Sequence, residues 1–198
     1  MGTNRLESFS DGVMAVAITL LVLDITVPDP ARTTALGHAL ARAWPNYAAY
    51  VISFITIGII WINHHAMISR LQRADHTILI LNLLLLMSIG VLPFATALMS
   101  AYLRQGHGQH LAAAIYSGAF LAMSILFATL NRHILLRKAH YIGADLSLER
   151  RRLILKRSLT GLLPYVVATG LAFVSPYATI AICGAVAVFY ALPLASSS

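Results

Sequence analysis

The sequence predicts an all-α integral membrane protein, and its composition, its apolar segments and the placement of its charges all support this fold class. Of the 198 residues, 59% are hydrophobic and only 11% are charged, and the mean hydropathy is +0.77. Soluble domains carry about 25% charged residues, so this chain has too few to cover a surface that faces water. A soluble domain is therefore excluded.

Six apolar segments meet or nearly meet the length of about 20 residues that a helix needs to cross a bilayer. We expect one six-helix transmembrane domain over residues 1–198. The expected spans are 6–27, 44–62, 77–103, 111–136, 153–174 and 177–192.

Prolines mark the boundaries and interruptions of these spans. Pro28 and Pro30 close the first span, and Pro45 opens the second at a helix position that tolerates proline. Pro93 inside the third span predicts a kink, and Pro164 lies inside the fifth.

Lysine and arginine are distributed unevenly between the two sides of the predicted bundle. Eleven fall on the side of the N-terminus and three on the other, which places both termini in the cytoplasm. The net charge of +7 therefore reflects orientation in a lipid bilayer, and we expect no nucleic-acid partner. The eleven are Arg5, Arg70, Arg73, Arg132, Arg137, Lys138, Arg150, Arg151, Arg152, Lys156 and Arg157; the three are Arg32, Arg42 and Arg104.

The first span begins with charged residues and has two different faces. Arg5 and Asp11 stand at the head of the apolar segment, which is costly in lipid, so the helix is expected to do more than anchor the chain. At 100° per residue, Thr19, Leu20 and Leu23 share a stripe with Val16, and Asp11 lies about 140° from Val16. The apolar stripe is free to face lipid, another subunit or a pore, and periodicity does not choose among these.

An acidic side chain within a span needs a donor from another helix of the same subunit. The candidates are Trp61, Asn63, His64 and His65 in the WINHH sequence, and Asn82 in the third span. An indole or a neutral imidazole can donate to a carboxylate without adding a second charge. From the residues alone, the more common interpretation is a helix end in the headgroup layer, where Trp and His are frequent.

Metal sites and catalytic sites have little support. Adjacent His64 and His65 point about 100° apart and with His76 do not form a zinc motif, so we expect no metal and no cofactor. Cys183 is a lone cysteine, which excludes an internal disulfide. The spans contain no nucleophile with a base and no carboxylate pair, so an enzyme is not expected. The TVGYG filter of potassium channels is also missing.

The segment RLESFSDGVMAVAITLLVLDI at residues 5–25 resembles the first helix of the transmembrane protein 175 family. This family comprises endosomal and lysosomal potassium channels and their prokaryotic relatives, and its signature is RxxxFSD. Arg5, Phe9, Ser10 and Asp11 fill that signature. WINHH at 61–65 and NLLLLMSIGVLPFAT at 82–96 resemble the family's second and third helices, whereas the last three helices match only in hydropathy and length.

The resemblance implies a tetrameric, potassium-permeable cation channel in which the first helix of each subunit lines the pore without a re-entrant filter. The animal relatives carry two six-helix repeats and dimerise. This chain has one signature and is similar to the prokaryotic form, which implies a homotetramer in the plasma membrane of a prokaryote that conducts monovalent cations, with K⁺ as the permeant ion.

The resemblance also assigns roles to residues of the stripe. Val16 matches the narrowest ring, where the family usually has Ile or Leu, so this departure implies a wider or leakier constriction. Leu20 and Leu23 match further apolar rings, and Thr19 matches a threonine implicated in selectivity. Apolar rings gate by dewetting, since they offer an ion nothing in exchange for its water.

The signature residues match a polar network that holds the pore helix. The network comprises Arg5, Phe9, Ser10 and Asp11 with Trp61, Asn82 and one of His64 and His65.

Asp24 lies near the outer mouth of the implied pore. It either concentrates cations or is an ordinary acid at a helix end.

Two other functions stay open. One is a proton-coupled secondary transporter that uses Asp11, although paired broken helices are not evident in the sequence. The other is a structural or enzymatic membrane protein, for which the spans offer no active-site set.

Overall fold

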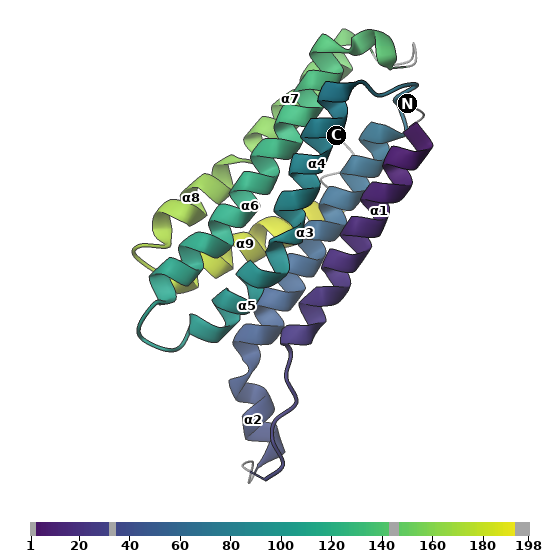
Figure 1. Ribbon diagram of the computed structural model, residues 1–198. Coiled ribbons are helices and arrows are strands. Elements are labelled where there is room, and N and C mark those ends of the chain that lie inside the picture. The colour runs from purple at the N-terminus through teal and green to yellow at the C-terminus, as the bar shows by residue number, and fades with distance from the viewer. Residues whose placement is uncertain (1–2, 32–34, 143–146, 193–198) are drawn as a thin grey trace.

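The computed structural model describes residues 3–31, 35–142 and 147–192, which form a bundle of helices (Figure 1). One isolated β-bridge joins Leu71 and Ile142 within these residues. Four helical segments are long and apolar enough to cross a membrane, and the apolar helix Pro176–Ala191 is shorter. The predicted all-α class is confirmed. The four long segments are Thr3–Asp24, Trp44–Ile68, His76–Tyr102 and Gln109–Arg137.

The first span ends earlier than the expected 6–27. Helix α1 (Thr3–Leu20) tightens into the 3₁₀ turn η1 (Leu21–Asp24), and Ile25 is extended. Pro28 disfavours helical geometry at the residue before it and cannot donate a backbone hydrogen bond, so the helix does not reach Val27. A short helix, α2 (Leu36–Arg42), follows where none was expected and projects beyond the bundle (Figure 1).

The second span is longer than the expected 44–62. Helix α3 (Trp44–Ile68) begins with Pro45 in its first turn and continues past the WINHH sequence. These polar residues therefore lie inside the helix and not at its end. The helix continues because His64 is fully buried and hydrogen-bonded to Asn82, which compensates the burial of its polar ring.

The third and fourth spans follow the expected positions closely. The third consists of α4 (His76–Gly90) and α5 (Leu92–Tyr102), separated at Val91, so the helix is interrupted next to Pro93 as expected for a proline kink. The fourth is α6 (Gln109–Arg132), which continues as the π-helical turn η2 (His133–Arg137) and then the 3₁₀ turn η3 (Ala139–Tyr141).

The expected fifth span, 153–174, is divided between two helices. Helix α7 (Leu148–Thr160) is polar and basic, and α8 (Leu163–Leu171) is apolar. Pro164 cannot donate to the carbonyl of Thr160 and would clash with it, which explains the break between them. Helix α9 (Pro176–Ala191) starts from Ser175, whose side chain accepts a hydrogen bond from the Ala178 amide.

The helices pack around α6, which contacts α4, α5, α7, α8 and α9. Helix α1 contacts α3 and α4 and lies at the opposite side of the bundle from α8 (Figure 1). The centre is formed by Tyr116 and Phe120 of α6, whose ring centroids are 4.7 Å apart, and by Tyr165 of α8. Helix α1 is therefore held from one side only within the chain.

Asp75 joins the start of α4 to the end of the fourth span. One carboxylate oxygen accepts a hydrogen bond from the Ile78 amide at 2.9 Å, and the other lies 2.8 Å from Nζ of Lys138. The Lys138 ammonium and then the Ile78 amide lower the pKa of the Asp75 carboxyl, and Asp75 raises the pKa of Lys138. This contact fixes the geometry at this end of α4 and α6.

We predict that Asp75→Asn lowers the unfolding temperature at neutral pH and that the difference from wild type disappears in acid. Because the folded-state pKa of Asp75 is lowered, its stabilisation is present above the ordinary aspartate pKa of about 4 and is lost as pH falls through the lower folded value. Thermal unfolding across this pH range measures the effect. Asn is as good a helix cap as Asp, whereas Asp75→Ala should cost about 1 kcal/mol more. A difference that is unchanged in acid would contradict this.

Candidate functional site

Helix α1 is buried along one stripe that faces α3 and α4. The buried residues follow one another at intervals of three or four, which places them on one face of an α-helix. They are Leu6, Ser10, Met14, Ala17 and, in η1, Leu21. This stripe determines which face of α1 is left uncovered.

The uncovered face contains the stripe predicted from the sequence. Val16, Leu20 and Leu23 are 57%, 44% and 72% exposed within the single chain. Thr19 lies beside them, and its hydroxyl donates to the Val16 carbonyl at 2.9 Å. Because that bond uses the hydroxyl hydrogen, the exposed Thr19 oxygen is left to accept a donor or to contact a cation.

Asp11 points sideways to α3. Its Oδ1 accepts a hydrogen bond from Nε1 of Trp61 at 2.8 Å. Among the candidate donors it is Trp61 that contacts this carboxylate, and the neutral indole satisfies it without adding a second charge.

A fully buried series of hydrogen-bonded side chains connects α1, α4 and α3. Nδ2 of Asn82 donates to Oγ of Ser10 at 3.0 Å, and Ser10 donates to the Leu6 carbonyl at 2.8 Å. Nε2 of His64 lies 2.7 Å from Oδ1 of Asn82. Since that amide oxygen can only accept, His64 carries its proton on Nε2. Nδ1 of His64 is then an acceptor, and it is buried without a hydrogen-bond partner in the described residues.

The two adjacent histidines have different partners. His65 lies on another side of α3, where its Nδ1 is 2.8 Å from Oε1 of Glu7 and its ring packs against Trp61. His64 is therefore the histidine that joins the buried network, and His65 pairs with α1 near its start. Among the residues that the structure describes, no three His, Cys, Asp or Glu side chains form a group that could hold a metal ion.

The signature residues divide between the two faces of α1. Ser10 and Asp11 contact the other helices of the chain, whereas Arg5 and Phe9 are exposed. Arg5 and Phe9 precede Val16 by about three and two helical turns, which places them on the uncovered side. The structure thus does not bring Arg5 and Phe9 into the cluster with Trp61.

Asp24 is attached to the other helices at the far end of the first span. Oγ of Ser100 in α5 donates to its Oδ2, and Nδ2 of Asn46 in α3 donates to its backbone carbonyl at 3.1 Å. Neither partner was anticipated from the sequence, since a lone Ser or Asn in a span carries no signal of its partner. A role of Asp24 in concentrating cations stays a prediction.

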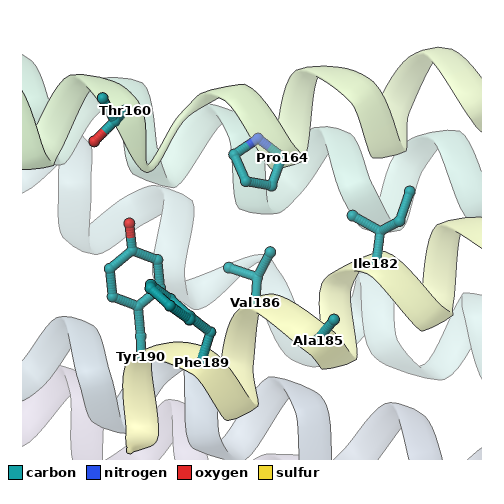
Figure 2. A pocket seen from close by; sticks show the side chains of 7 residues that line it. All are labelled: Thr160, Pro164, Ile182, Ala185, Val186, Phe189 and Tyr190. Carbon is teal, nitrogen blue, oxygen red and sulfur yellow. The ribbon is translucent and has the colours of Figure 1, made fainter. Parts of the chain in front are cut away.

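A groove between α8 and α9 lies away from α1 and contains none of the predicted site residues. Figure 2 shows that Pro164, Ile182, Val186 and Phe189 give it an apolar surface. Its polar side-chain atoms are the hydroxyls of Thr160 and Tyr190 at one end.

We predict that Asn82→Leu lowers the stability of the fold by about 1–3 kcal/mol, because it leaves the buried donor of His64 without an acceptor. The readout is thermal unfolding in detergent. Asn63→Leu is the matched control, because Asn63 is exposed on α3 and its amide donates to the Ile59 carbonyl of the same helix. Equal effects of the two substitutions would show that the buried hydrogen bonds of Asn82 do not stabilise the fold.

Comparison with known proteins finds relatives over almost the whole chain. Residues 5–93 match the family described as the endosomal/lysosomal potassium channel TMEM175. A protein of Streptomyces collinus named a potassium channel is 44% identical over 188 residues, which cover 95% of this chain and 91% of that protein. A protein of Chamaesiphon minutus with the same designation is 39% identical and covers 96% and 94%.

A solved structure and an animal relative extend the comparison. The crystal structure of a lysosomal potassium-selective channel TMEM175 homolog from Chamaesiphon minutus superposes with a TM-score of 0.85 at 37% identity, over 99% of this chain and 98% of that one. The Gallus gallus protein named endosomal/lysosomal proton channel TMEM175 is 40% identical over 117 residues, which cover 55% of this chain and 23% of that protein. The resemblance expected from the RxxxFSD signature is confirmed: this chain belongs to the TMEM175 family.

Proposed function

We propose that this protein is a potassium-permeable cation channel in the plasma membrane of a prokaryote, with four copies around one axis and α1 of each copy lining the pore. Relatives named potassium channels match almost the whole chain, which supports this activity. In this arrangement the chain crosses the membrane six times, with residues 153–174 forming the fifth crossing, α9 forming the sixth, and both termini in the cytoplasm. Conduction is passive and needs no cofactor.

The observation that carries the proposal is the uncovered face of α1. A helix fastened on one side by buried polar bonds presents only small, apolar and hydroxyl side chains along the central part of its other side. Four such faces around an axis form rings of Val16, Leu20 and Leu23. These rings exclude water when narrow and admit hydrated ions when slightly dilated.

Thr19 is the polar member of this face between Val16 and Leu23. Four exposed threonine oxygens form a weak ligand ring, which favours K⁺ over the more strongly hydrated Na⁺ to a moderate degree. The buried hydrogen bonds among Ser10, Asn82 and His64 hold α1 against α3 and α4. A small rotation of those helices would therefore move the rings as well.

We predict that the size and polarity of residue 16 set the potassium flux of protein reconstituted in liposomes. Val16→Asn and Val16→Ala should raise the flux severalfold, because they wet or widen the narrowest ring. Val16→Trp should reduce it to the level of protein-free vesicles. Val166→Trp is the matched control, because Val166 is similarly exposed on α8, at the opposite side of the bundle. Flux that is indifferent to residue 16, or equally sensitive at residue 166, would refute a pore along α1.

Asp11→Asn distinguishes the channel from a proton-coupled transporter. The asparagine can still accept the Trp61 indole hydrogen bond but cannot exchange a proton. We predict that the variant retains potassium flux, which does not saturate and does not require a proton gradient. Loss of saturable, proton-coupled uptake in Asp11→Asn, with no single-channel currents in the wild type, would instead establish the transporter.

A further inference from the structure

A second hollow lies at the end of the bundle where α4 begins and α6 ends. Thr77 and Leu81 of α4 line one side. Thr129 and Arg132 of α6 line the other, together with residues of the π turn η2. Unlike the groove in Figure 2, whose lining contains no charged side chain, this pocket has two arginines.

The π turn brings the two arginines to one side. The Lys138 amide donates to the His133 carbonyl at 3.2 Å, a bond over five residues that adds one residue to the turn. In an α-helix Arg132 and Arg137 would point about 140° apart, whereas the wider turn lets both line the same pocket. Both are exposed, and in the part of the chain that the structure describes neither is in an ion pair.

A histidine, His133, also lines the pocket. Nε2 of His133 is buried and has no hydrogen-bond partner among the described residues. The nearby carboxylate, Asp75, is paired with Lys138 and so does not neutralise the arginines. Among the described residues, the lining therefore offers a phosphate two guanidinium groups that are in no ion pair, together with the hydroxyl of Thr77. The Thr129 hydroxyl already donates to the Ile125 carbonyl at 2.7 Å.

The pocket lies at the edge of the membrane-spanning region. His76 is the first residue of one candidate span and Arg137 the last of another, so the basic groups are at the level of lipid headgroups. Leu81 and Leu136 line the same pocket and offer apolar surface. The N-terminus of α1 is at this end of the bundle (Figure 1), on the side to which the sequence assigns eleven of the fourteen lysines and arginines.

We propose that this pocket binds the phosphate headgroup of an anionic glycerophospholipid from the cytoplasmic leaflet. Guanidinium groups bind phosphate through paired hydrogen bonds, and basic pockets between membrane helices on the cytoplasmic side suit such headgroups. The two leucines contact the upper part of an acyl chain. The choice of leaflet rests on the membrane orientation proposed above, whereas binding itself does not depend on ion conduction.

Phosphatidylglycerol titrated against the detergent-solubilised protein and followed by native mass spectrometry tests the site. Arg132→Gln/Arg137→Gln should weaken binding at least about tenfold. Arg150→Gln/Arg152→Gln on α7 is the matched control and should change it less than about twofold, because both arginines are exposed and lie outside the pocket. Circular dichroism checks that the variants keep their helicity.

A photoactivatable phosphatidylglycerol applied to the wild-type protein provides a test that needs no variant. It should label the peptide that contains residues 129–137. The proposal is overturned if the label falls elsewhere, if both double variants weaken binding equally, or if glycerophosphoglycerol without acyl chains displaces the lipid at an equal concentration. None of these readouts depends on potassium flux, so their failure is separate from a failure of the channel assignment.

Discussion

The buried hydrogen bonds among Ser10, Asn82 and His64 determine how the first helix is presented. They lie where water cannot replace them, so turning α1 about its axis would leave several polar groups unpaired at a cost of about 1–3 kcal/mol each. The fixed rotation of α1 decides that Ser10 faces the subunit and that Val16 does not. The candidate pore surface is therefore defined by the polar contacts on the other side of the same helix.

Polar contacts hold α1 near both ends, and in the described residues its middle packs through apolar side chains. Near its start Asp11 and Glu7 contact Trp61 and His65 of α3, and just beyond its end Asp24 contacts Ser100. Between them Met14 and Ala17 pack against the neighbouring helices, a kind of contact that permits small shifts without breaking hydrogen bonds. In the channel proposed above, the rings of Val16 and Leu20 lie in this middle part.

The departures from the expected spans have identifiable local causes. The fifth segment is split because Pro164 cannot bond to Thr160, which leaves the basic helix α7 as a separate element. Helix α3, the second span, continues through WINHH because residues of other helices form hydrogen bonds with its polar side chains. Hydropathy alone treats these polar residues as the end of the span. Hydropathy averages over all sides of a helix and so cannot detect a partner supplied by Asn82, 18 residues further along the chain.

The sequence by itself determined the membrane-spanning character, the family and the two faces of the first helix, because composition, the RxxxFSD signature and helical periodicity are local properties. It could not choose which donor meets Asp11, which histidine is buried, or whether Arg5 and Phe9 join Ser10 and Asp11. Those choices depend on how α3 and α4 are placed against α1, since adjacent residues on a helix point about 100° apart and only one of them can face a given neighbour. The same holds for Arg132 and Arg137, which line one pocket because the packed chain adopts a π turn at that position.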